Sequence, residues 1–258
     1  MRSALTLYFT SLLRSYLLSP AMYIGLTVFA GFFSLIGAVG TYGGKTPLPV
    51  WFSIMYLMFN FAIMGGLSRS IVVGSGALSY LIRHAGINPI KLTLVLTVAN
   101  MISQIVFSPL FLALTVLMYY IADKITLTVN VGLLISAIVL TSLFMTTLGI
   151  AFGLLMVGKA TTAKIANFIP LLPMILYFTS LLTPPDISSY NPITAIMILL
   201  TSSLKYEGPT YFIPIPPTLS LPVLTAVILT SSATLLLLST LLMKRIREVN
   251  IYDAAIGF

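Results

Sequence analysis

The chain has 258 residues, of which 59% are hydrophobic and only 7% are charged. Soluble domains carry roughly a quarter of charged residues, so this composition excludes an ordinary soluble domain and predicts that lipid surrounds most of the chain. The net charge of +8 comes from basic residues that form no continuous patch, which argues against a nucleic-acid-binding module. With no Cys and one His, neither a thiolate metal site nor an imidazole cluster is expected.

Residues 1–19 are predicted to form an amphipathic helix at the membrane surface. Apolar residues recur at helical spacing and polar residues recur one step away, which gives one face for acyl chains and one for water. The apolar set is Leu5, Phe9, Leu12 and Tyr16, and the polar set is Arg2, Thr6, Thr10 and Arg14. The alternative is an extension of the first membrane span. A cleavable signal is not expected, because Arg14 interrupts the apolar stretch.

Six apolar stretches are long enough to cross about 30 Å of hydrocarbon as helices. They are Ala21–Val39, Val50–Leu67, Leu92–Ile121, Val129–Val157, Ile165–Leu182 and Leu221–Met243. The third and fourth exceed one bilayer thickness, so we expect tilt, protrusion, or a bend at Pro109 in the third. The sequence therefore predicts an all-α, polytopic membrane protein built as a single domain over residues 1–258.

The orientation of the spans follows from the cations, since Lys and Arg are retained in short cytoplasmic loops. One side of the six-span topology holds Arg2, Arg14, Arg69, Arg83, Lys91, Lys159, Lys164, Lys244, Arg245 and Arg247, and the other holds only Lys45, Lys124 and Lys205. We therefore expect a multi-pass protein of the plasma membrane with both termini in the cytoplasm.

The loop between the second and third spans, residues 69–91, is predicted to contain a short helix that lies across the cytoplasmic surface. Leu78, Leu81 and Ile82 recur at helical spacing, Gly86 follows them, and Asn88-Pro89 is typical of a new helix start. The alternative is a loop that these residues merely anchor to the lipid headgroups.

Residues 183–220 are predicted to lie outside the cell. Eight of the fifteen prolines fall in this segment or just beyond it, the last at Pro222. Within it, an Asn cap at Asn191 and Pro192 at the first helical position open an apolar helix of some thirteen residues. That helix is too short to cross, so we expect it to be re-entrant or interfacial.

The sequence shows no set of residues suited to catalysis or to coupling with an ion gradient. All five acids fall in predicted loops or in the tail, whereas coupling to a proton or sodium gradient normally places an ionisable residue at bilayer depth. Ser75 and His84 lie near each other in one loop, but no acid orients the imidazole, so the chain is not expected to be an enzyme. The chain also lacks a phosphate loop. Energy for uphill work would have to enter through another polypeptide.

The chain resembles the type-2 ABC exporter permease family, the six-helix membrane subunits of ATP-driven exporters. The resemblance covers essentially the whole chain. It rests first on the amphipathic N-terminal segment and on Gly76–Lys91 between spans two and three. It rests also on Asn191-Pro192-Ile193-Thr194, which follows a fifth span containing Pro170 and Pro173. The last feature is the basic end at Lys244, Arg245 and Arg247. One departure is Ser79, which stands where many members carry a Glu.

The resemblance implies a subunit that binds no cofactor itself and pairs with a second permease subunit, identical or different. ATP and Mg²⁺ would sit on separate ABC-type ATPase subunits. The residues implied in coupling to the ATPase are Leu78, Leu81, Ile82, Arg83, His84, Asn88, Pro89 and Lys91. The residues implied in the translocation path, on spans two and five, are Phe59, Asn60, Tyr177 and Phe178, for which ordinary helix packing is the alternative.

Two other classes of function remain open at this stage. One is a gradient-driven carrier or channel, since backbone carbonyls alone can bind sodium, and the other is a membrane scaffold that transports nothing. A path without charged residues would suit an apolar or amphiphilic cargo.

Overall fold

The computed structural model describes residues 4–39, 48–123, 128–157, 175, 190–205 and 220–246. These residues are almost wholly helical, and five helical stretches among them are long and apolar enough to cross a membrane. The all-α, polytopic class predicted from the sequence is thereby confirmed.

The first described helices form one interrupted segment. Helix α1 (Ala4–Leu17) is followed by α2 (Pro20–Leu26), a π-helical stretch η1 (Thr27–Phe32) and α3 (Phe33–Val39). Pro20 opens α2 at a position where the missing N–H costs nothing. The predicted first span corresponds to Met22–Val39, and the π-helical stretch within it was not predicted.

The second and third spans are longer than predicted. Helix α4 (Leu48–Val73) runs six residues beyond the predicted end, through the polar stretch around Arg69, and a short helix α5 (Ser75–Arg83) follows it. Helix α6 (Pro89–Asp123) continues through Pro109 as a single element of 35 residues. At 1.5 Å per residue it is about 52 Å long, which exceeds the roughly 30 Å of hydrocarbon and calls for tilt or protrusion.

The remaining described elements complete the bundle. Helix α7 (Val131–Met156) begins at a cap in which the Asn130 side chain accepts a hydrogen bond from the Leu133 N–H. Helices α11 (Pro192–Ser203) and α12 (Leu221–Lys244) follow. Strands β1 (Thr128–Val129) and β2 (Leu204–Lys205) pair antiparallel, with Thr128 opposite Lys205, and tie the start of α7 to the end of α11.

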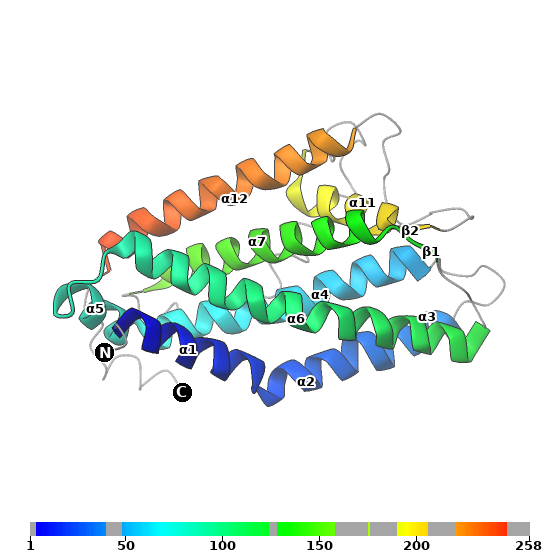
Figure 1. Ribbon diagram of the computed structural model, residues 1–258, viewed down its shortest axis with the longest axis horizontal. Coiled ribbons are helices and arrows are strands. Elements are labelled where there is room, and N and C mark those ends of the chain that lie inside the picture. The colour runs from blue at the N-terminus through cyan, green and yellow to red at the C-terminus, as the bar shows by residue number, and fades with distance from the viewer. Residues whose placement is uncertain are drawn as a thin grey trace.

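Figure 1 shows the long helices running side by side along the molecule, with α5 at one end of the bundle and the β1–β2 pair at the other. The start of α1, helix α5 and the end of α12 meet in one apolar cluster, which includes Leu5, Leu78 and Met243. We call this the α5 end. Most described cations belong to α5, to α1 or to the neighbouring ends of α4, α6 and α12: Arg14, Arg69, Arg83, Lys91, Lys244 and Arg245.

The predicted fifth span, Ile165–Leu182, lies outside the described residues apart from Ile175. Its flanks are placed. Val157, just after α7, packs in the cluster at the α5 end, whereas α11 lies at the opposite end beside β1 and β2 (Figure 1). The fifth crossing stays a prediction.

Helix α1 has the two faces predicted for it, but its apolar face contacts protein. Thr6, Thr10 and Arg14 are exposed, while Leu5, Leu12 and Tyr16 pack into the cluster at the α5 end. The helix packs along α6 (Figure 1). Lipid contact by this face, expected from the sequence, is therefore replaced by contact with the bundle.

Helices α4 and α7 approach closely because two glycines lie in their interface. A Cβ added at Gly153 would come within 2.9 Å of the Ile71 Cβ, and one at Gly149 within 2.9 Å of the Met64 Cγ. Because the two helices lie so close together, the Ser68 hydroxyl donates a hydrogen bond to the Gly149 carbonyl at 2.7 Å. Small residues allow this kind of contact in membranes, where packing rather than the hydrophobic effect drives association.

Candidate functional site

A cluster of polar side chains is buried where α4, α6 and α7 meet. Such groups are expensive inside a membrane bundle and are kept there for a structural or functional reason. We call this set the three-helix polar cluster, and each member is at most 1% exposed. Its members are Tyr56 and Asn60 of α4, Asn100, Gln104 and Ser108 of α6, and Ser142 and Thr146 of α7.

Hydrogen bonds connect much of the cluster. The Asn100 and Gln104 side-chain amides both donate to the Thr146 hydroxyl, at 3.0 and 3.1 Å. The Tyr56 hydroxyl lies 2.6 Å from that of Ser108, which is also 2.7 Å from the Gln104 carbonyl. These bonds link the three helices through side chains, in addition to their apolar contacts.

Four polar atoms of the cluster have no hydrogen-bond partner among the residues that the structure describes: Asn60 Oδ1, Asn100 Oδ1, Gln104 Oε1 and Ser142 Oγ. The Asn60 and Ser142 side chains approach the Tyr56 hydroxyl without completing a hydrogen bond. A buried acceptor left unsatisfied costs about 1–3 kcal/mol. The cluster is therefore rich in unused hydrogen-bond acceptors.

An aromatic group lies on α4 and α6 beside the cluster. Phe111 contacts three rings of α4, with centroid distances of 6.0 Å to Phe52, 5.5 Å to Tyr56 and 5.3 Å to Phe59. Edge-to-face and offset contacts of this kind stabilise ring pairs beyond their burial. They fix the position of α4 against α6.

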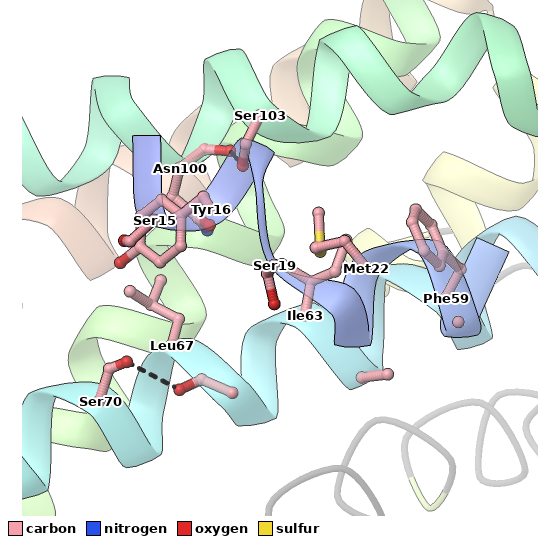
Figure 2. A pocket seen from close by; sticks show the side chains of 13 residues that line it. Ser15, Tyr16, Ser19, Met22, Phe59, Ile63, Leu67, Ser70, Asn100 and Ser103 are labelled. Carbon is pink, nitrogen blue, oxygen red and sulfur yellow. Dashed lines mark hydrogen bonds between the residues drawn. The ribbon is translucent and has the colours of Figure 1, made fainter. Parts of the chain in front are cut away.

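A cavity of about 320 Å³ adjoins the cluster. Figure 2 shows that its walls come from the end of α1 and the turn after it, from α2, from α4 and from α6. Asn100 belongs both to the cavity wall and to the three-helix polar cluster. The other lining residues are Ser15, Tyr16, Ser19, Met22, Gly25, Phe59, Ala62, Ile63, Gly66, Leu67, Ser70 and Ser103.

The path residues named from the sequence are divided by the structure. Phe59 lines the cavity and is 1% exposed, whereas Asn60 points into the three-helix polar cluster and donates to the Tyr56 carbonyl at 2.7 Å. Tyr177 and Phe178 lie outside the described residues. Asn100 and Gln104 were not predicted as site residues, although two amide side chains in an otherwise apolar span are a signal of a functional or packing role.

The predicted coupling segment forms a helix, α5, whose apolar side faces the bundle. Leu78 is buried, and Leu81 and Ile82 are partly buried against the cluster at the α5 end. That cluster joins α5 to α4, α6, α7 and α12, through Ile71, Leu92, Ile150 and Met243 among others.

The other side of α5 and the turn after it are open to solvent. Tyr80 is 61% exposed, and its ring lies 5.1 Å from that of His84. Arg83 reaches across to the Ile246 carbonyl at 3.4 Å. Gly86 adopts a φ of 62°, which favours glycine, and Asn88 then caps α6 by accepting from the Ile90 N–H at 2.8 Å. Pro89 is the first residue of α6, and Lys91 is exposed.

The short helix α11 begins at Pro192, with Asn191 accepting from the Ile193 N–H at 3.0 Å. It is packed among α4, α7 and α12, and nearly all of its residues are buried. The Thr201 and Ser53 hydroxyls lie 2.9 Å apart. Its depth in the membrane stays a prediction.

Among the residues in the described ranges, no group of three His, Cys, Asp or Glu side chains is placed to hold a metal ion. Comparisons with protein-family models, curated proteins and solved structures found no match to this chain.

Proposed function

We propose that this chain is the membrane-spanning permease subunit of an ABC transporter, working as an exporter in the plasma membrane. It forms the substrate path, pairs with a second permease subunit, and is driven by a separate ATP-binding subunit at the α5 end. Both termini lie in the cytoplasm, and α11 dips into the bundle from the outside.

The arrangement of α5 is the observation that carries this proposal. The helix is anchored by Leu78 to a cluster that includes residues of α4, α6, α7 and α12, and it exposes Tyr80 and His84 at the end rich in cations. A partner that pushes on the exposed side would therefore move several membrane-spanning helices at once. Coupling of distant sites needs a contiguous, packed connection of this kind.

The mechanism follows from that connection. Closure of two ATPase subunits around ATP would displace α5, and the anchored helices would move against the second permease subunit, so that the path opens alternately to the two sides. ATP and cargo have to bind the two arrangements with different affinity, because only such a difference can shift the equilibrium between them.

The proposal is tested by isolating the affinity-tagged chain from native membranes in mild detergent. We expect an ATPase with a phosphate loop to co-purify. Tyr80→Asp places a charge on the exposed side of α5 and should reduce the recovered ATPase about tenfold or more, the effect of losing about 1.4 kcal/mol of binding energy.

The matched control is Tyr190→Asp. Tyr190 is 63% exposed and precedes α11, which lies away from α5 (Figure 1), so this variant should recover as much ATPase as the unchanged chain. The proposal fails if the unchanged chain brings down no such ATPase, or if both variants behave alike.

A gradient-driven carrier or channel remains the second candidate because of the three-helix polar cluster. Its unpaired amide and hydroxyl oxygens are the kind of neutral ligands that a monovalent cation accepts. This alternative predicts that the chain alone, in vesicles, dissipates an imposed sodium gradient, and that replacing Gln104 by Leu stops it.

A further inference from the structure

Three small residues on α4, one helical turn apart, border open space. They are Ala62, Gly66 and Ser70, and all three line the cavity. A Cβ added at Gly66 would meet no atom within 4 Å. At Gly153, by contrast, the added Cβ would lie 2.9 Å from Ile71. Packing among the described residues therefore explains the small residue at position 153 but not the one at position 66.

The cavity wall is amphiphilic. Met22, Phe59, Ile63 and Leu67 give it an apolar part, while serine hydroxyls from α1, the turn after it, α4 and α6 give it a polar part (Figure 2). A volume of about 320 Å³ lies at the small end of the range for ligand pockets. It accommodates a small headgroup together with part of an alkyl chain.

None of the thirteen lining residues carries a charge at neutral pH. Tyr16 is the one ionisable group among them, and burial raises its pKa above the ordinary value, so its hydroxyl stays protonated. A charged headgroup would lose its hydration here without meeting an opposite charge, which is costly. The wall therefore selects an uncharged ligand.

The polar part of the wall offers acceptors more than donors. Asn100 donates its amide N–H to Thr146, and its Oδ1 has almost no accessible surface, so the serines supply the accessible polar atoms of the wall. Ser15, Ser70 and Ser103 use their hydroxyl protons on backbone carbonyls of their own helices, at 2.8, 3.1 and 2.7 Å. Their oxygens keep lone pairs, so a ligand that fits this wall brings hydrogen-bond donors.

We propose that this cavity binds an uncharged amphiphile whose headgroup carries hydroxyl groups. The hydroxyls donate to Ser15 and Ser70, whose side chains are exposed, and the alkyl chain lies over Ala62, Ile63 and Phe59 in the space that Gly66 leaves open. Both a membrane lipid and a transported cargo have this chemistry. The site belongs to this chain alone and stands whether or not an ATPase drives it.

The test uses a monoacylglycerol with a photoactivatable diazirine on its acyl chain, added to the purified full-length chain in nanodiscs. After illumination, mass spectrometry maps the labelled residues. We expect labelling to concentrate on Met22, Phe59, Ile63 and Leu67. Labelling spread evenly over the lipid-facing helices would overturn the proposal.

Gly66→Leu fills the open space and should reduce labelling of these residues about tenfold or more, corresponding to about 1.4 kcal/mol of lost affinity. Ala62→Leu is a second variant of the same kind. The matched control is Gly31→Leu, because Gly31 also has no atom within 4 Å of an added Cβ and does not line the cavity. Equal labelling of Gly66→Leu and Gly31→Leu would contradict the proposal.

Competition tests the selectivity for uncharged headgroups. Unlabelled monoacylglycerol should displace the probe at concentrations about tenfold lower than lysophosphatidate or an alkane of the same chain length. Equal or better displacement by the anionic lipid would overturn the inference. A further outcome would also overturn it: the unchanged chain binds no probe, and Gly66→Leu changes the oligomeric state. A helix of a second copy would then fill the space beside Gly66.

The two sources of ligand are separated by following a fluorescent monoacylglycerol in vesicles that contain the chain with its co-purified companions. Movement across the bilayer on addition of ATP identifies a cargo, and retention on the protein identifies a bound lipid. Labelling of the chain alone is measured without ATP and without an ATPase. The test of the cavity and the test of the ABC-transporter proposal can therefore fail independently of each other.

Discussion

At the scale of single residues, buried serines of this bundle fall into two kinds. Ser68 donates to two carbonyls, those of Met64 at 3.0 Å and Gly149 at 2.7 Å, and thereby links α4 to α7. Ser142 is equally buried but completes no hydrogen bond. The first hydroxyl stabilises the packed state, while the second is an unsatisfied polar group.

The two kinds predict opposite effects of one substitution. Ser142→Ala removes an unsatisfied hydroxyl and should raise the free energy of unfolding by up to about 1 kcal/mol. Ser68→Ala removes an interhelical hydrogen bond and should lower it by about 0.6 kcal/mol, a typical value in membranes. Unfolding of the two variants in mixed micelles checks the signs. Destabilisation by both would show that Ser142 has a partner in the folded protein.

Tyr8 on α1 predicts a response to alkaline pH. Burial raises the pKa of Tyr8 from 10.0 to about 12. Because the folded-state pKa lies above the unfolded one, the contribution of this neutral tyrosine to stability is complete below pH 10 and is lost as the pH rises through 12. Absorbance of tyrosinate should contain a component near pH 12 that is missing from Tyr8→Phe. A midpoint near 10 would mean that α1 is not docked.

At the scale of elements, the sequence predicted the positions of the helices well and the contacts between them poorly. Predicted and observed ends of α12 agree to one residue, since an apolar run bounded by Pro222 and Lys244 determines both. The predicted end of the second span lies six residues before the end of α4, because polar Ser68 and Arg69 are typical of a loop. In the structure, the helical hydrogen bonding continues to Val73. Pro109, one position where a bend was expected, lies inside the continuous helix α6.

The candidate site was predicted less well, for a physical reason. The cavity exists because α1, α2, α4 and α6 do not fill the space between them. The residue pattern of a single helix cannot predict such a gap between helices. Asn100 and Gln104 stand out in the sequence as amides in an apolar run, but their shared bond to Thr146 depends on how α6 and α7 are placed. Phe59 was named for the path and lines the cavity.

The glycines of α7 predict a test of the α4–α7 contact. In Gly153→Ala the new Cβ would lie 2.9 Å from the Ile71 Cβ and 3.0 Å from the Ser68 carbonyl oxygen, so the helices must separate, at a cost of about 1–3 kcal/mol. Gly66→Ala meets open space and should be neutral or stabilising by up to about 1 kcal/mol. Thermal unfolding midpoints compare the two. Equal midpoints would show that α4 and α7 are not in close contact.

At the scale of the whole molecule, the two ends of the bundle differ in charge and in form. The α5 end carries most of the described cations, and the opposite end carries the β1–β2 pair and α11 (Figure 1). Retention of cations in the cytoplasm supports the proposed orientation, in which α5 lies inside the cell and α11 towards the outside.

This orientation is tested with single cysteines, since the chain has none of its own. Ser202→Cys lies at an exposed position of α11, and Tyr80→Cys at an exposed position of α5. A membrane-impermeant maleimide should label the former in intact cells and the latter only after the membrane is opened. Labelling in the reverse order would invert the topology and remove the ATPase from the α5 end.

The most direct test of the whole account is to measure ATP hydrolysis and sodium movement by the purified material in vesicles. We predict that the chain with its co-purified companion hydrolyses ATP, that Tyr80→Asp in the chain lowers this rate while Tyr190→Asp does not, and that the chain alone leaves a sodium gradient intact. A chain that dissipates the gradient by itself, with hydrolysis absent or indifferent to Tyr80, would contradict the account.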